Sequence, residues 1–130
     1  MSDDMLEDIY RDYITTLNER RFDDLGQFVH STMTYNGAPW TLSDYQSLLR
    51  SDVVAIPDLR YQVLTVVTDG TQVAARLWFD CTPSGTFLDL ETSGRRVQFG
   101  EHVFYLFRNG RICDVWSLID KEAVRRQLAA

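Results

Sequence analysis

Residues 100–120, GEHVFYLFRNGRICDVWSLID, decide the fold of this chain. Two apolar runs flank an Arg-Asn-Gly-Arg turn, which is the pattern of a β-hairpin. Three ionisable residues, Glu101, His102 and Asp114, interrupt these runs. Ionisable groups inside an apolar hairpin either line a pocket or form satisfied polar pairs at an interface, so this segment bears on function as well as on fold.

Strand patterns continue on the N-terminal side of this hairpin. Residues 60–67 and 72–80 alternate apolar and polar side chains around Asp69-Gly70, a dipeptide that favours a hairpin turn. Residues 81–94 are rich in turn residues and predict a loop. On the C-terminal side, Asp120 can cap a short helix over residues 121–128. The second half of the chain is therefore predicted to be a meander of antiparallel strands closed by a helix.

The first half of the chain predicts helices. Apolar residues recur with a helical period from Leu6 to Leu17, which indicates a helix over residues 3–20. The pattern then predicts a short helix over 22–30, a short strand over 33–35, and a third helix over 42–54 that Thr41 caps with Asp44. Together the elements predict one α+β domain over residues 1–130, with the N-terminal helices packed on one face of a bent sheet.

Composition excludes several classes of function. The formal net charge is −6, and basic residues form no stripe that would follow a nucleic-acid backbone. The two cysteines and two histidines lack metal-ligand spacing, and no phosphate-binding loop is present, so we expect no metal and no cofactor. The acidic start has no signal-peptide core, and no run approaches a membrane span. We therefore expect a cytoplasmic protein with neither nucleic-acid nor membrane partners.

Three segments give the chain a resemblance to a known family. They are LNERRFDDLGQFVH (residues 17–30) with the Tyr-Asn-Gly that follows, VAARLWFDCTPSGTFLDLETSGRRVQF (residues 73–99) and EHVFYLFRNGRICDVWSLIDKEAVRRQL (residues 101–128). In order and spacing they resemble the SnoaL-like polyketide cyclases, or "ester cyclases", of the nuclear-transport-factor-2-like superfamily. The resemblance covers nearly the full length of the chain.

The resemblance implies a conical α+β fold, in which a curved antiparallel sheet and the N-terminal helices enclose an apolar pocket. Cyclases of this type perform an intramolecular aldol condensation without metal or organic cofactor, using a carboxylate as general acid/base. Relatives on the fold include isomerases, dehydratases, hydrolases and binding modules. Counted from Gly110, the catalytic His and Asp of the family fall on Val103 and Ser117 here. If this chain is an enzyme, its proton-transfer group must lie elsewhere.

The register of the closing hairpin decides which polar groups share a face. A two-residue turn at Asn109-Gly110 would pair Arg108 with Arg111. A three-residue turn with Gly110 as a bulge would pair Phe107 with Arg111. The Asn-Gly dipeptide favours the first turn and the family resemblance favours the second. We predict the second, three-residue turn.

In that register Glu101 lies on an inward apolar face that it shares with Tyr105, and opposite Ser117. Desolvation then raises the pKa of Glu101, which makes it a candidate general base near neutral pH. Ser117 is the residue placed to hold the carboxylate, and Ser117 and Tyr105 are candidates for substrate contact. The alternative is a structural role for Glu101, in a buried ion pair with Arg76 or Arg96.

The opposite face holds His102 and Asp114 among Phe104, Trp116 and Leu118. This face is too apolar to contact water over a whole hairpin, and the resembled family often dimerises through its sheet, so we predict a homodimer. In the predicted register His102 and Asp114 are diagonal neighbours. They would form either a structural hydrogen bond at the interface or a catalytic dyad.

Further candidates for substrate binding come from the first half of the chain and from one later strand. The phenol of Tyr13 can donate to a developing enolate oxygen, with core packing as the alternative. His30, Tyr35 and Asn36 lie at positions that border the pocket in the resembled family. Trp40 is either a lid or a core residue, and Arg76 stands mid-strand, where a cation can bind an acidic group.

Together with these residues, the resemblance to the SnoaL-like family implies a cofactor-independent enzyme that acts on a small apolar carbonyl compound by acid/base proton transfer, as a cyclase, isomerase or hydrolase. Two alternatives remain open. One is a non-catalytic module that binds a small apolar ligand. The other is a dimerising module of the same fold without a functional pocket.

Overall fold

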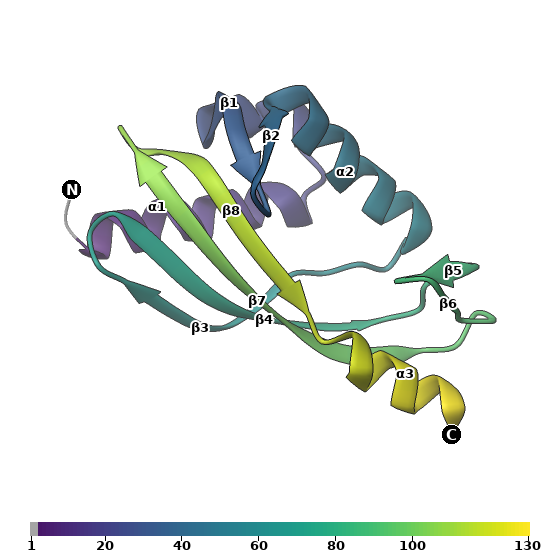
Figure 1. Cartoon of the computed structure of the whole chain (residues 1–130). Helices are drawn as coiled ribbons and strands as arrows, with labels where there is room; N and C mark the ends of the chain where they lie inside the picture. The colour runs from purple at the N-terminus through teal and green to yellow at the C-terminus, as the bar shows by residue number, and fades with distance from the viewer. Residues whose placement is uncertain (1–2) are drawn as a thin grey trace.

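A six-stranded sheet forms the main layer of the computed structural model, which describes residues 3–130 (Figure 1). The strand order is β2-β1-β8-β7-β4-β3, and all neighbours are antiparallel except β1 and β8, which are parallel. The sheet curves along its long strands, and the α+β prediction is confirmed. The strands are β1 (Val29–Tyr35), β2 (Ala38–Thr41), β3 (Gln62–Thr68), β4 (Gln72–Cys81), β7 (Val97–Arg108) and β8 (Arg111–Ile119).

Helices α1 (Asp3–Asn18) and α2 (Leu42–Ala55) cover the concave face of the sheet (Figure 1). The apolar stripe of α1, from Leu6 to Leu17, is buried against the strands because its side chains recur with the helical period. α2 begins as predicted, since the Thr41 side chain accepts from the Asp44 backbone N–H (3.1 Å) while the Asp44 carboxylate accepts from the Thr41 backbone N–H (2.9 Å).

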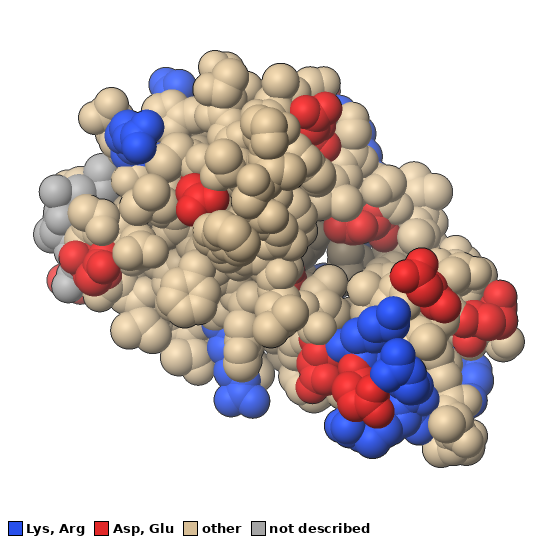
Figure 2. Space-filling model, viewed as in Figure 1, with Lys and Arg blue, Asp and Glu red and all other residues tan. Residues whose placement is uncertain are grey.

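The C-terminal helix α3 (Lys121–Ala129) packs against the far end of β7. It begins where Asp120 accepts a hydrogen bond from the backbone N–H of Ala123 (3.0 Å), as its sequence predicts. Charged side chains of both signs gather over this end of the molecule, whereas the face over the strands has few of them (Figure 2).

The segment predicted as a second helix over 22–30 is a 3₁₀-helix followed by a strand. The helix η1 covers Phe22–Gln27, and β1 begins at Val29. The chain from Val29 to Tyr35 includes β-branched residues, and its pairing with β8 offers hydrogen bonds that an isolated short helix lacks. β1 is therefore longer than the predicted strand at 33–35.

Strand β2 was not predicted. Asn36 and Gly37 both adopt positive φ and return the chain so that Tyr35 pairs with Ala38. Pro39 is tolerated in β2 because this strand is the edge of the sheet, where no partner needs its missing N–H.

The loop predicted at 81–94 contains a small second sheet, β5 (Thr86–Phe87) with β6 (Leu90–Glu91). The hydroxyl of buried Thr92 donates to the carbonyl of Pro83 (3.1 Å), which ties the end of this loop to its start. Phe87 packs on Phe99 of β7 with ring centroids 5.5 Å apart. The loop thus contributes apolar cover at one end of the main sheet.

The closing hairpin has a two-residue turn, so the predicted three-residue turn is wrong. Arg108 pairs with Arg111, and Asn109 and Gly110 have φ angles of 53° and 77°. Both angles fit the mirror-image turn that Asn-Gly favours, and this turn matches the twist of the flanking strands. The local preference of the dipeptide determined the turn.

A bulge at Cys113 follows this turn and determines which side chains face inward. Phe107 pairs with Ile112, but Leu106 pairs with Asp114, so Cys113 is the extra residue of β8. One extra residue reverses the facing of every later side chain. The predicted inner face is therefore retained despite the wrong turn, and Glu101 lies opposite Ile119 while Ser117 lies opposite Val103.

Candidate active site

A cavity of about 320 Å³ lies between the helices and the concave face of the sheet. α1 and α2 supply one side of its lining, and β4, β7 and β8 supply the other. Most lining side chains are aliphatic or aromatic. Besides the tyrosines, the polar groups of the lining are Asp52, Glu101 and Ser117, and the lining includes no lysine or arginine from the described part of the chain.

Glu101 occupies the middle of β7 and points into this cavity. Burial among apolar side chains raises the pKa of Glu101 to about 7, because desolvation disfavours the carboxylate. The Ser117 hydroxyl donates to Glu101 Oε2, which opposes this shift, and the negative charge of Asp52 adds to it. Glu101 therefore changes its protonation state near neutral pH while a hydroxyl fixes its position.

The predicted alternative for Glu101, an ion pair with an arginine, is not formed. Arg76 is exposed on the outer face of β4, across from His102, and does not line the cavity. Arg96 binds Asp80 with two hydrogen bonds, of 2.6 Å and 2.5 Å. The strand alternation that turns Glu101 inward turns Arg76 outward.

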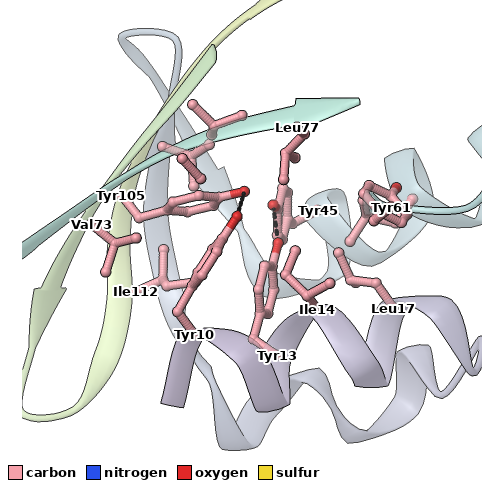
Figure 3. Packing of buried hydrophobic residues seen from close by; sticks show 14 of the residues in the cluster. Tyr10, Tyr13, Ile14, Leu17, Tyr45, Tyr61, Val73, Leu77, Tyr105 and Ile112 are labelled. Atoms are coloured by element: carbon pink, nitrogen blue, oxygen red, sulfur yellow. Dashed lines mark hydrogen bonds between the residues drawn. The ribbon is translucent and has the colours of Figure 1, made fainter. Parts of the chain in front are cut away.

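Tyrosines form the polar part of the aromatic lining (Figure 3). Five of the six tyrosines in the chain line the cavity, and the sixth, Tyr10, lies beside it. The hydroxyls of Tyr13 and Tyr45 form a hydrogen bond of 2.6 Å, and Tyr10 donates to Tyr105 at 3.5 Å. Burial raises the pKa of each of these four phenols, so they are neutral hydrogen-bonding groups at physiological pH.

Tyr35 and Trp40 form a stacked pair at the β1–β2 side of the site. Their ring centroids are 4.5 Å apart and their planes differ by 14°. Tyr35 lines the cavity, and a hydrogen bond with Ser117 lowers the pKa of its phenol by less than burial raises it. Trp40 lies outside the lining and supports the Tyr35 ring from behind.

Asn36 and His30 hold strands rather than line the cavity. Asn36 Oδ1 accepts from the backbone N–H of Ser117 (2.8 Å), which fixes the residue that binds Glu101. His30 lies in β1 and its Nε2 donates to the carbonyl of Arg108 (2.7 Å), not at a helix end as the sequence pattern predicted. Both contacts tie β1 to the closing hairpin.

His102 and Asp114 lie on the outer face of the sheet, away from the cavity that Glu101 faces. The predicted hydrogen bond between them is not formed, because the observed register places Asp114 opposite Leu106, four residues from His102 and about 13 Å away at the usual strand rise. The Asp114 carboxylate accepts instead from the Thr34 hydroxyl and from Trp116 Nε1 (2.9 Å).

Asp52 is a site residue that sequence reasoning missed. It lies in the last turn of α2, and burial raises its pKa to about 6. One signal was available in the sequence, because Asp52 interrupts the apolar positions Leu48, Leu49 and Ile56 at helical spacing. This interruption alone does not indicate a functional residue, because only the position of α2 over the sheet places Asp52 at the cavity.

Within residues 3–130, no three or more His, Cys, Asp or Glu side chains gather as they would around a metal ion. In the same range, no helix combines the length and apolar character needed to cross a bilayer.

Comparison with known proteins places the chain in a family. The model of the SnoaL-like polyketide cyclases matches residues 7–128. The chain belongs to this family. A comparison with curated proteins finds no match.

Solved structures of similar fold agree with this SnoaL-like assignment. A SnoaL-like polyketide cyclase from Agrobacterium tumefaciens is 51% identical, with a TM-score of 0.93 over 95% of this chain and 97% of that one. TsrD from Streptomyces laurentii is 22% identical, with a TM-score of 0.86 over 100% and 98%. IdmH from Streptomyces antibioticus is 19% identical, with a TM-score of 0.83 over 96% and 99%. The last two similarities concern the fold alone.

Proposed function

We propose that this SnoaL-like chain is a cofactor-independent enzyme that moves protons on a small apolar carbonyl compound, with Glu101 as the acid/base group. One observation supports this most strongly. Glu101 is the carboxyl that faces the cavity from the sheet, its pKa is raised to about 7, and Ser117 holds it in place. A carboxyl that titrates near the working pH transfers protons in either direction most efficiently.

The lining of the cavity supports the proposed substrate class. Its volume of about 320 Å³ is at the lower end of the range of roughly 300–1,000 Å³ that small-molecule pockets occupy. Apolar side chains surround a polar group formed by Glu101, Ser117 and Tyr35. A molecule with an apolar body and one carbonyl end at this group fits the arrangement. The Tyr35 phenol is the donor suited to a developing enolate oxygen, because the single proton of the Ser117 hydroxyl is already donated to Glu101.

The test uses 2-tetralone, a neutral bicyclic ketone with acidic C–H bonds beside its carbonyl. Loss of deuterium from α-deuterated 2-tetralone in buffered water, followed by mass spectrometry, reports proton transfer without knowledge of the natural substrate. We expect the wild type to accelerate this loss and Glu101→Gln to reduce the acceleration by about 10²-fold or more, since a positioned acid/base contributes that much.

Two controls separate catalysis from binding. Glu7→Gln removes a carboxylate from the surface of α1 and is expected to exchange at the wild-type rate. Fluorescence titration with 2-naphthol measures occupancy of the cavity, and Glu101→Gln is expected to retain it. A wild type that binds 2-naphthol but never accelerates exchange would contradict the enzyme proposal and favour a ligand-binding module.

We also propose that two copies associate through the outer face of the sheet. Phe104, Trp116 and Leu118 are 53%, 52% and 75% exposed on neighbouring strands. An apolar group of this kind on a sheet face is typical of a protein–protein contact. The partner on this face is a second copy of this chain.

A further inference from the structure

Asp52 reaches the cavity from a different layer than Glu101. It is in α2, where Leu48, Leu49 and Ile56 line the cavity on the same side of the helix. Within residues 3–130 its carboxyl has neither a hydrogen-bond partner nor an ion pair, and it is partly buried. The charged form of this group is therefore neither solvated as on the surface nor compensated by a neighbour.

The position of Asp52 in the helix makes its charge more costly. The last turn of α2 has no basic residue, and the exposed carbonyls there form the negative end of the helix dipole. A carboxylate at this end is disfavoured, and one beside apolar side chains is disfavoured further. Neither packing nor helix stability accounts for an aspartate here, whereas an apolar residue would suit both.

Two carboxyls therefore face one cavity from two walls, Asp52 from α2 and Glu101 from β7. Phenols are the other titratable groups that interact with the two carboxyls. Tyr35 and Tyr61 of the lining are close enough to Asp52 to sense its charge, and Tyr10, beside the lining, senses the charge of Glu101. Arg20 lowers the pKa of Tyr61, but it does not line the cavity and its guanidinium donates to the carbonyl of Leu59.

We propose that Asp52 is the second proton-transfer residue of this site and forms an acid–base pair with Glu101 around a neutral carbonyl substrate. This inference rests on the proposed function and extends it. Enolisation needs both a base for the carbon proton and an acid for the oxygen, and one carboxyl is not well placed to be both at once. The two walls supply one group on each side of a substrate bound between them.

The step balances within the pair. The ionised carboxylate removes a proton from the carbon next to the carbonyl, and the C–H electrons form the C=C bond while the C=O π electrons move to oxygen. The neutral carboxyl gives its proton to that oxygen. The ketone becomes its enol, one carboxyl has gained a proton, the other has lost one, and the total charge is unchanged.

The raised pKa values of the two carboxyls support an acid–base pair. The pKa of Asp52 is raised to about 6 by burial alone, whereas the pKa of Glu101 is raised to about 7 by burial and by the charge of Asp52. Both carboxyls therefore titrate close to neutral pH, and the charge of one disfavours the charge of the other. In that range the pair holds one proton, so one carboxyl is the base while the other is the acid.

The pair also restricts the substrate class. The lining contains two carboxyls and, within the described residues, no lysine or arginine. An anionic ligand would meet one negative charge on the pair and no compensating cation, in an apolar cavity where such repulsion is strong. We therefore expect neutral ketones and aldehydes, and not molecules with a free carboxylate or phosphate, to occupy the site.

The test is the pH profile of 2-tetralone exchange, corrected for the buffer rate, in the wild type and in Asp52→Asn. Asp8→Asn, which changes an exposed aspartate on α1, is the matched control. We expect a bell-shaped wild-type profile with limbs near pH 6 and 7. Asp52→Asn should lose one of the two limbs and about 10²-fold in rate. A wild-type rate with both limbs in Asp52→Asn would overturn the proposal.

Two further measurements keep the outcomes separate. Carboxyl ¹³C NMR titration should show a lower pKa for Glu101 in Asp52→Asn than in the wild type, because a repelling charge is gone; an unchanged pKa would refute the pair without any assay of activity. Exchange that depends on Glu101 but not on Asp52 would refute the pair and leave the proposed function standing. No exchange by the wild type would refute both. Circular dichroism checks that each variant folds.

Discussion

Ser117 donates a hydrogen bond to Glu101 although the two residues are not cross-strand partners. Glu101 lies opposite Ile119, and Ser117 lies opposite Val103, so the contact is diagonal across one face of the hairpin. The backbone N–H of Ser117 donates to Asn36 in the turn between β1 and β2. The Glu101 carboxyl is therefore positioned by the hydroxyl of a residue that the β1–β2 turn holds in place.

Ser117→Ala should raise the pKa of Glu101 above about 7, because the lost hydrogen bond stabilises the carboxylate. The pH limb that belongs to Glu101 should move upward by the same amount. Carboxyl ¹³C NMR titration checks the pKa, and the exchange profile checks the limb. Ser117→Thr, which keeps a hydroxyl, is the control. If the pKa of Glu101 stays the same or falls in Ser117→Ala, the hydroxyl does not stabilise the carboxylate.

Glu101 should make the protein less stable as pH rises. Its pKa is raised from 4.5 to about 7 in the folded state, so the folded protein holds this proton when the unfolded chain has lost it. The free energy of unfolding then falls between pH 5 and 8 by about 2 to 3 kcal/mol on account of this group. Glu101→Gln should remove that part of the fall. Urea unfolding of both proteins at the two pH values measures it, and equal falls would contradict the shifted pKa.

The hydrogen bond between Tyr13 and Tyr45 should appear as a coupling free energy between the two residues in the stability of the protein. Both phenols are buried, and their oxygens are 2.6 Å apart. Tyr13→Phe leaves the Tyr45 hydroxyl without its partner and should cost about 1 to 3 kcal/mol of unfolding free energy. The double change to Phe should cost less than the sum of the two single changes, because no hydroxyl is then left unpaired. Strict additivity in the double-mutant cycle would contradict the contact.

The outer face of the sheet should control oligomeric state. Phe104→Glu introduces a charge into the exposed apolar group and should convert the proposed dimer into monomers in sedimentation velocity. Val54→Glu is the matched control, because Val54 is 77% exposed on α2 and lies outside this face. A wild-type monomer at all protein concentrations would contradict the dimer, as would loss of the dimer in both variants.

Local signals predicted most elements of the fold. The helical period of α1, the capping box at Thr41 and the Asp120 cap each depend on residues close in sequence. The strand character of Val29 and His30 depends on β8, more than 80 residues away in the chain, and so the local pattern at 22–30 predicted helix instead.

In the closing hairpin the inward-facing side chains were predicted correctly, although the predicted turn and strand register were wrong. Asn109-Gly110 specifies its turn locally, but the bulge at Cys113 has no sequence signal of its own. Only the need to bury Val115 and to keep Trp116 over Gly37 accounts for it in the structure. Glu101 and Ser117 could be predicted as site residues because alternation sets their face. Asp52 could not, because its role depends on how α2 lies over the sheet.

The titration of Glu101 in the wild-type protein is the most direct test of its proposed acid/base role. Carboxyl ¹³C NMR, with the resonance assigned by its absence in Glu101→Gln, gives the pKa of this one group without an assay or a substrate. We predict a value near 7, which reflects a carboxyl enclosed by apolar side chains beside a second acidic group. A value near the ordinary 4.5 would mean that the carboxyl is solvated, and would contradict an acid/base role at neutral pH.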